Sequence, residues 1–237
     1  MNERELNNLI KEKEATLSLA FPSLMRKVYV WMTLALVITG VTAYGVAHST
    51  NFIYTLMENR WIMWALIIAE LALVFILSAR VMRMSLTTAT LMFILFSAIN
   101  GTTLSVIFLA YSTSVIAKVF FITAGTFGAT ALFGYTTKRD LSSIGRILYM
   151  ALFGLIIATV VNIFVRSSGF DIILSYLGVA IFIGLTAWDT QKIKIMLAQC
   201  DEPNEEAHKI ALLGSLSLYL DFVNLFLYML RIFGGRE

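Results

Sequence analysis

Two aspartates stand inside long apolar segments of this sequence. Asp189 occurs in GLTAWDTQKI, and Asp221 occurs in SLSLYLDFVNLFLYMLRIFG. A charged side chain at the centre of a membrane helix costs about 2.5–3.5 kcal/mol on insertion scales, so such residues usually face a partner, a cavity or a transport path. Because the two aspartates lie on successive predicted helices, we predict that they form one shared site.

The chemistry of such a pair follows from its poor solvation. Two carboxyl groups a few ångströms apart cannot both ionise cheaply, so they titrate as one unit and can hold a single proton near neutral pH. A cation would compete for the doubly ionised pair. Calcium takes about six to eight oxygen ligands, and two carboxylates supply too few oxygens for tight binding. We therefore predict that Asp189 and Asp221 form a transient calcium site for permeation or sensing. The alternative is a buried carboxylate that only fixes helix register.

The depth of the two residues is the main objection to a shared site. Asp221 lies about 17 Å into the last apolar segment by helix rise. Asp189 would lie nearer the membrane edge if its helix ended at Gln191. The two side chains meet only if the sixth helix extends further inward, or if the seventh helix begins deeper, at about Leu213–Leu216.

Three further polar residues fall inside apolar segments, and we predict that they line or support the same path. Glu70, in IIAELALVF, lies ten residues from Arg80. About 15 Å of helix separates them, so they cannot pair within the segment, and Glu70 must be protonated, paired across helices or exposed to a cavity. For Asn100 a structural role between helices and a cavity lining are equally open. Asn224 shares a helix face with Asp221.

Other chemistry finds little support in the residue counts. The two histidines, His48 and His208, both lie near predicted segment ends, and Cys200 is the single cysteine. A serine hydrolase, a histidine metal site or a disulfide framework is therefore not expected, and we predict neither an enzyme nor a cofactor. A di-aspartyl membrane protease also uses two aspartates on adjacent helices, but the residues around Asp189 and Asp221 do not resemble its motifs.

The elements that must position these residues are membrane helices. Hydrophobic residues make up 59% of the 237 and charged residues only 14%, against about 25% charged in soluble domains. The net charge of +3 is too small to indicate nucleic-acid binding. Seven segments are long enough to span a bilayer: Val28–His48, Trp61–Arg80, Leu86–Ala110, Val115–Tyr135, Ile147–Arg166, Ile172–Gln191 and Ile210–Phe233.

We therefore predict an all-α polytopic membrane protein, a seven-transmembrane-helix bundle in the lipid bilayer. Residues 26–237 would form this single domain, and residues 1–25, which lack the pattern of a cleavable signal peptide, a cytoplasmic tail or surface helix. With the N-terminus in the cytoplasm, thirteen of the 18 Lys and Arg residues are cytoplasmic, all except Arg60, Lys118, Arg166, Arg231 and Arg236. A re-entrant last segment would bring the final two arginines inside as well, so the side of the C-terminus stays open.

These residues also carry a family likeness. The segment GLTAWDTQKIK, followed by LSLYLDFVNLFLYMLRIFG, strongly resembles the closing signature of the transmembrane Bax inhibitor motif family. The stretch ELALVFILSARVMRMSLTTATLMFILFSAINGTTLSVIF resembles its second and third helices, and the likeness covers about residues 25–235. The resemblance implies six helices around a central last helix, and the short loops indicate a bacterial inner-membrane member.

The resemblance also implies a function and its residues. It implies a pH-sensitive calcium leak, gated by two aspartates that share a proton and that match Asp189 and Asp221. The acidic residue of the second helix matches Glu70. A basic latch falls in RVMR, so Arg80 or Arg83 would supply a releasable counter-charge.

A second interpretation is a membrane regulator that acts by binding another membrane protein, such as a quality-control protease. It predicts that the aspartates matter little and that the N-terminal tail or the loops matter greatly. A deletion of residues 1–24 would separate the two interpretations.

Overall fold

A computed structural model of the protein describes residues 3–200 and 204–235, with side chains from residue 22 onward. These two ranges form helices and contain no strand. In chain order the elements are α1 (Glu3–Ala47), α2 (Thr50–Glu58), α3 (Arg60–Arg80), the 3₁₀ turn η1 (Val81–Arg83), α4 (Leu86–Leu104), α5 (Ile107–Ala110), α6 (Thr113–Thr136), α7 (Ser142–Val165), α8 (Ser168–Ala198) and α9 (Glu205–Phe233).

Seven helical segments of the described chain are long and apolar enough to cross a membrane, so the predicted all-α polytopic class is confirmed. They are Pro22–Ala47, Arg60–Arg83, Leu86–Ala110, Thr113–Thr136, Ser142–Val165, Ser168–Ala198 and Glu205–Phe233. The third comprises α4 and α5, which a short bend at Ser105 and Val106 separates. The first continues without a break from the N-terminal residues of α1, so Pro22 lies inside a helix.

Two helices are longer than predicted, and the extra length of both affects the site. Helix α8 continues to Ala198, seven residues beyond Gln191. Helix α9 begins at Glu205 and runs unbroken to Phe233, so the last segment is one continuous helix and not a re-entrant loop. The longer α8 meets the first of the two conditions under which Asp189 and Asp221 can approach each other.

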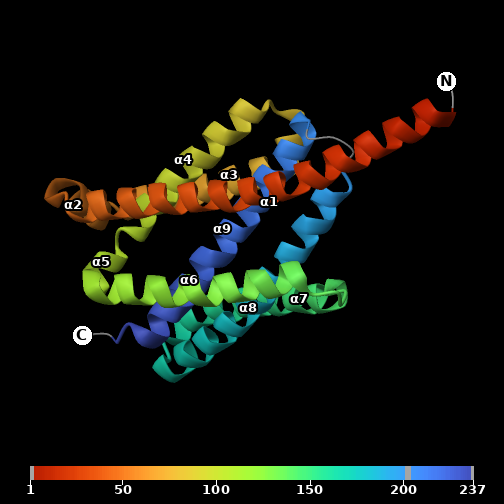
Figure 1. The fold of residues 1–237 in the computed structure, drawn as a ribbon. Coiled ribbons are helices and arrows are strands. Elements are labelled where there is room, and N and C mark those ends of the chain that lie inside the picture. The colour runs from red at the N-terminus through yellow and green to blue at the C-terminus, as the bar shows by residue number, and fades with distance from the viewer. Residues whose placement is uncertain (1–2, 201–203, 236–237) are drawn as a thin grey trace.

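Helix α9 lies between two groups of helices (Figure 1). On one side α1 and α4 pack against it, with α3 behind α4. On the other side α6 and α8 pack against it, with α7 behind α8. Of the seven segments α9 is the most buried, as a central last helix requires.

The connections that carry most of the loop arginines and lysines gather at one end of the bundle, here called the basic end. Lys27 of α1 lies 3.5 Å from the His208 ring, and the Leu86 backbone N–H donates to Glu205, so α1, α4 and α9 meet there. The C-terminus lies at the other end (Figure 1).

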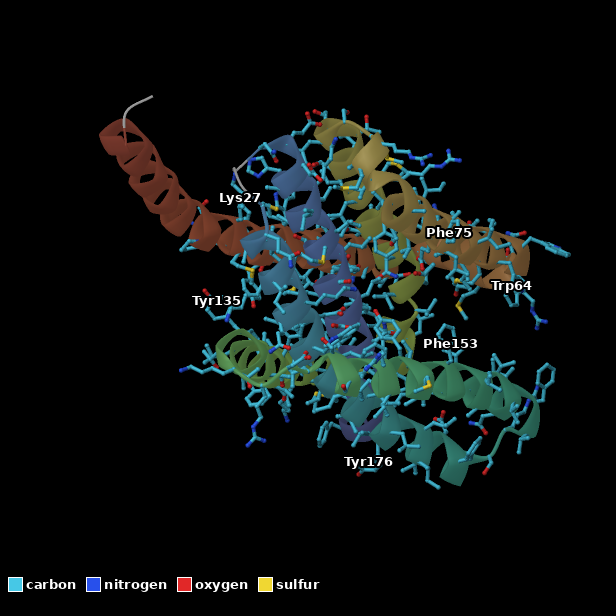
Figure 2. The ribbon with its side chains drawn as sticks, turned by 90° about the vertical axis from the view of Figure 1, so that its right-hand side faces the viewer. Lys27, Trp64, Phe75, Tyr135, Phe153 and Tyr176 are labelled. Atoms are coloured by element: carbon cyan, nitrogen blue, oxygen red, sulfur yellow. The ribbon has the colours of Figure 1, made fainter. Side chains whose placement is uncertain are left out.

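The outside of the bundle is apolar, as lipid contact requires. Trp64 and Phe75 on α3, Phe153 on α7 and Tyr176 on α8 all lie exposed on it (Figure 2). In water such a surface would be an aggregation hazard. Hydrocarbon solvates it, so these residues place α3 and α7 against lipid.

Candidate functional site

Helix α8 reaches the centre of the bundle because α6 lets it approach closely. Gly134 of α6 faces the Ala187 backbone, and a β-carbon at this position would collide with the Ala187 carbonyl group. Small residues allow this type of contact between membrane helices. Asp189 follows Ala187 by two residues and is 4% exposed. The close α6–α8 crossing therefore holds this acidic residue inside the protein.

The structure brings the two predicted aspartates together. Asp221, on α9, is 5% exposed, and its carboxyl group lies within electrostatic range of Asp189 on α8. Ser217, one turn before Asp221, contacts the Asp189 carboxyl group as a hydrogen-bonding neighbour. Asp189 Oδ1 and Asp221 Oδ2 are buried, and neither has a hydrogen-bond partner among the described residues. We call Asp189 and Asp221 the aspartate pair.

Aromatic and basic side chains cover the aspartate pair. The Tyr149 ring of α7 packs edge-on against Trp188, with ring centroids 5.1 Å apart. Tyr149 also lies within electrostatic range of both aspartates. Lys192 lies over the Trp188 ring at 5.0 Å and is the basic group that acts on Asp189. The counter-charge near the pair thus comes from α8 itself, one turn beyond Asp189.

A side-chain amide fixes the loop between α6 and α7 above this site. Gln191 Oε1 accepts a hydrogen bond from the Leu141 backbone N–H at 2.8 Å, and Gln191 Nε2 donates to the Arg139 carbonyl at 2.8 Å. Lys194 donates to the Tyr135 carbonyl at 2.7 Å. These bonds connect the basic end of α8 to the loop between α6 and α7. Hydrogen bonds therefore hold this loop in place beside the aspartate pair.

Outside the membrane-spanning segments, Asp140 in this loop has a clear electrostatic role. Its carboxylate accepts hydrogen bonds from the Ser142 side chain and from the Ser142 backbone N–H, the latter at 2.8 Å. These bonds hold the pKa of Asp140 below its usual range. Asp140 therefore remains ionised near neutral pH and stabilises the start of α7.

A second polar cluster lies on the opposite side of α9, and we call it the Glu70 network. Glu70 Oε2 accepts from the Asn100 amide at 3.3 Å, and Oε1 accepts from the Thr103 hydroxyl at 2.6 Å. The Tyr219 hydroxyl of α9 donates to Asn100 Oδ1 at 2.9 Å and lies 2.7 Å from the Thr39 hydroxyl of α1. The network thus joins α3, α4, α9 and α1.

One helix therefore carries both clusters. Tyr219 and Asp221 are two residues apart on α9, which turns them about 200° from each other around the helix axis. Tyr219 is fully buried toward α1, α3 and α4, and Asp221 is buried toward α8. The two clusters are therefore joined through a single helix.

A family model described as "Inhibitor of apoptosis-promoting Bax1" matches residues 22–237. The chain belongs to this Bax inhibitor family. It is 48% identical to the inner membrane protein YbhL of Escherichia coli over 214 residues, which are 90% of this chain and 92% of that relative. An uncharacterized protein of Borreliella burgdorferi is 42% identical over 90% of this chain and 92% of its own length. The match supports an inner-membrane location.

The Bax inhibitor fold brings only some of the sequence-predicted residues together. Asp189 and Asp221 form one cluster, while Glu70 and Asn100 lie in the other. Asn224 donates to the Leu220 carbonyl of its own helix at 2.8 Å, so its amide is engaged locally.

Arg80 and Arg83 are both exposed at the basic end. Within the described part of the chain, no ion pair joins either arginine to an aspartate. The turn η1, which follows Arg80 and ends at Arg83, packs against α9 near Leu213 through Val81. In this conformation the latch position lies beside α9 and apart from the aspartate pair.

Six residues around the two clusters were missed from the sequence: Thr39, Thr103, Tyr149, Lys192, Ser217 and Tyr219. Lys192 and Ser217 had a usable signal, because a lysine three residues after Asp189 and a serine four residues before Asp221 share a helix face with them. Tyr149 and Tyr219 had none. A tyrosine in an apolar segment is read as a packing residue, because the sequence does not show which group its hydroxyl contacts.

Proposed function

We propose that this protein is a pH-sensitive leak for calcium or a similar cation, gated by the aspartate pair. The observation that carries the proposal is the pair itself: two buried carboxyl groups, on adjacent membrane helices, each with an oxygen that has no hydrogen-bond partner among the described residues. A purely structural carboxylate would have its oxygens satisfied. Unsatisfied, adjacent carboxylates are suited to take up a proton or a cation.

The electrostatics of the pair supply the switch. Two ionised carboxylates in contact range, at an effective dielectric constant of about 20, repel each other by a few kcal/mol, on the order of 3 kcal/mol. One shared proton removes this repulsion and allows α8 and α9 to stay closely packed, whereas loss of that proton favours their separation. A free-energy difference of this size shifts a two-state equilibrium by roughly a hundredfold. The pair therefore couples proton binding to the position of the central helix.

The donor chemistry supports a hard cation as the permeating ion. Carboxylate, amide and hydroxyl oxygens, which calcium prefers, make up both clusters. Among the described residues no group of three or more His, Cys, Asp and Glu side chains forms a metal site. Weak binding suits a path that an ion must leave as easily as it enters. Both oxygens of Glu70 are hydrogen-bonded, so it would attract the cation on the α3 side of α9 through its charge and not through a free oxygen.

Calcium flux into liposomes that contain a calcium-sensitive dye tests the proposal. We expect purified protein to carry a flux that changes from about pH 6 to about pH 8. Asp189→Asn and Asp221→Asn should each flatten this profile. The double variant should be no flatter than either single variant, because the two groups titrate as one unit.

Asp171→Asn is the matched control for this experiment. Asp171 lies on α8 as well, but at the other end of the bundle, where its carboxylate is 3.7 Å from Arg231. This variant should keep the pH profile of the natural sequence. A folded protein that carries no more flux than empty liposomes would refute the leak.

A further inference from the structure

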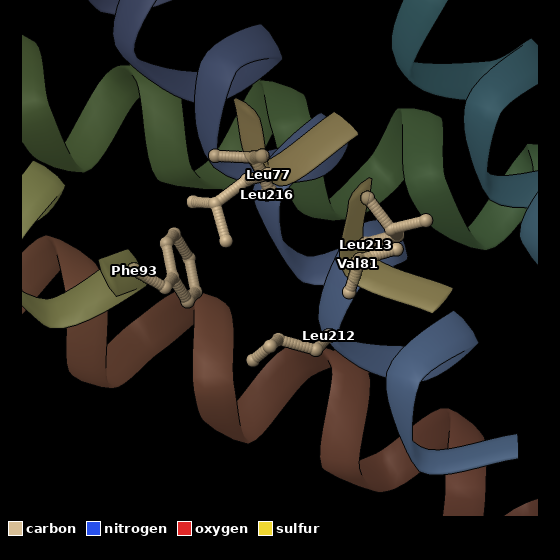
Figure 3. A pocket seen from close by; sticks show the side chains of 6 residues that line it. All are labelled: Leu77, Val81, Phe93, Leu212, Leu213 and Leu216. Atoms are coloured by element: carbon tan, nitrogen blue, oxygen red, sulfur yellow. The ribbon is translucent and has the colours of Figure 1, made fainter. Parts of the chain in front are cut away.

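Six apolar side chains fill the space between α9 and the α3–η1–α4 segment, on the basic-end side of the Glu70 network (Figure 3). They are Leu77, Val81, Phe93, Leu212, Leu213 and Leu216. The gap between them is too narrow to hold a water molecule. We call these six residues the apolar layer.

The apolar layer is in register with the Glu70 network on three helices. Glu70 and Leu77 are seven residues apart on α3, Phe93 and Asn100 are seven apart on α4, and Leu212 and Tyr219 are seven apart on α9. Residues seven apart in a helix share a face and lie about 10 Å apart along the axis. The same three helices thus present a polar level and, about 10 Å further toward the basic end, an apolar level.

The two levels are also in direct contact. The Phe93 ring packs edge-on against the Tyr219 ring, with centroids 5.9 Å apart. Leu216 lies one turn before Tyr219 and is 3% exposed. An ion that reached Glu70 and Asn100 would next meet carbon atoms, with no oxygen to replace its hydration shell.

We propose that the apolar layer is the gate that closes the path between Glu70 and the basic end. A hydrophobic constriction excludes water and therefore excludes ions until its walls separate. The inference rests on the proposed leak and assigns the closure to residues other than the aspartates. Movement of α9 opens the layer, because Leu212, Leu213 and Leu216 all lie on that helix.

The position of η1 gives the facing wall a way to move. Helix α3 ends at Arg80, where the backbone changes to the 3₁₀ turn that contains Val81, and α4 begins again at Leu86. Val81 is 1% exposed and lies in the layer. The wall opposite α9 is therefore built partly from a turn between two helices.

A polar substitution in the layer tests the gate. Leu216→Asn lowers the cost of hydrating the gap, and we expect the calcium flux of liposomes at the most closed pH to rise on the order of tenfold. Leu155→Asn is the matched control, since Leu155 is also buried, at 4% exposed, but lies on α7 and not in the apolar layer, and it should leave the flux unchanged.

These outcomes separate the gate from the leak. If folded Leu216→Asn carries the flux and pH profile of the natural sequence, the gate is wrong and the leak stands. If the natural sequence carries no flux but Leu216→Asn does, the leak as proposed is wrong and the gate is supported. Absence of flux from every folded variant overturns both proposals.

A cysteine probe covers the case in which Leu216→Asn does not fold. In a Cys200→Ser background, Leu216→Cys should react with a cationic thiol reagent only at the pH values that give the highest flux. Fast reaction at every pH, or none at any pH, contradicts a gate at this level. The background protein without the new cysteine gives the baseline.

Discussion

The two sides of α9 bury polar groups in opposite ways. In the Glu70 network both Glu70 oxygens, both polar atoms of the Asn100 amide and the Tyr219 hydroxyl are hydrogen-bonded. In the aspartate pair one oxygen of each carboxyl group is buried without a partner among the described residues. The first cluster is satisfied as it stands, whereas the second needs a proton or a cation to be satisfied.

This difference assigns different tasks to the two halves of the bundle. A satisfied network fixes the relative positions of the helices it joins, so α1, α3 and α4 form a frame around Tyr219. An unsatisfied carboxyl pair stores free energy that protonation releases. Since α9 carries a member of each cluster, the proposed mechanism requires that a proton bound on the α8 side changes contacts on the α3 side.

The largest expected effects come from the glycines that position each cluster. Gly134→Leu would force a side chain into the Ala187 backbone, and Gly101→Leu would force one into the Thr39 backbone. Overpacking against backbone cannot relax easily, so we expect each variant to lose about 3 kcal/mol of stability or more. Thermal unfolding in detergent measures this loss.

The same pair of variants sharpens the comparison between the clusters. Gly134→Leu displaces α8 and should also remove the pH dependence of stability that the aspartate pair supplies, while Gly101→Leu should retain it. Gly128→Leu is the control, because no atom lies within 4 Å of a β-carbon at that position of α6. If Gly134→Leu is as stable as Gly128→Leu, the close α6–α8 crossing does not position Asp189.

Much of the fold was predictable because bilayer thickness fixes helix length. The seven predicted apolar segments correspond to the seven membrane-length helical segments of the described chain, and the family likeness implied the central last helix. The sequence left the inward end of α8 open, because Lys192 and Lys194 could either end the span or lie on a helix that continues past Gln191. In the fold Lys194 bonds to the Tyr135 carbonyl and Lys192 lies over Trp188, so both charges are accommodated while the helix continues.

The candidate site was predictable only where a residue was out of place in its segment. Asp189, Asp221 and Glu70 are charged residue types in apolar segments. The free-energy cost of burying a charge in a membrane identified them as candidates. The division of these residues into two clusters was not predictable. It depends on the angle between Tyr219 and Asp221 around α9 and on which helices pack against each face, and hydropathy contains no information on either.

Removing one polar group from each cluster should change the stability of the protein in different ways, by smaller amounts than the glycine variants do. Tyr219→Phe leaves the buried Asn100 Oδ1 without its donor, and we expect a loss of about 1–3 kcal/mol. Asp221→Asn removes the repulsion that arises when the pair loses its shared proton, so stability should stay about the same near neutral pH and rise by about 1 kcal/mol toward pH 8, where the natural pair begins to lose that proton. Thermal unfolding of both variants in the same detergent measures the sign.

The control for this pair of variants is Tyr228→Phe. Tyr228 is on α9 too, and it stacks on Phe182 and contacts Arg231 through its ring. Its loss of a hydroxyl group should change stability little. If Asp221→Asn destabilises the protein as much as Tyr219→Phe does, then the aspartate pair is a structural device and the contrast between the two sides of α9 is false.

The smallest effect concerns an aspartate that belongs to neither cluster. Hydrogen bonds from Ser142 hold the pKa of Asp140 below its usual range. The ionised Asp140 therefore contributes its full stabilisation of the fold above the unfolded-state pKa of about 3.9. This contribution is lost as the pH falls through the lower folded-state pKa. From about pH 6 to about pH 8 Asp140 therefore stays ionised. Asp140→Asn should cause a small decrease in Tm and no change in the pH profile of calcium flux. A shifted flux profile in this variant would mean that the loop between α6 and α7, and not the aspartate pair alone, senses the proton.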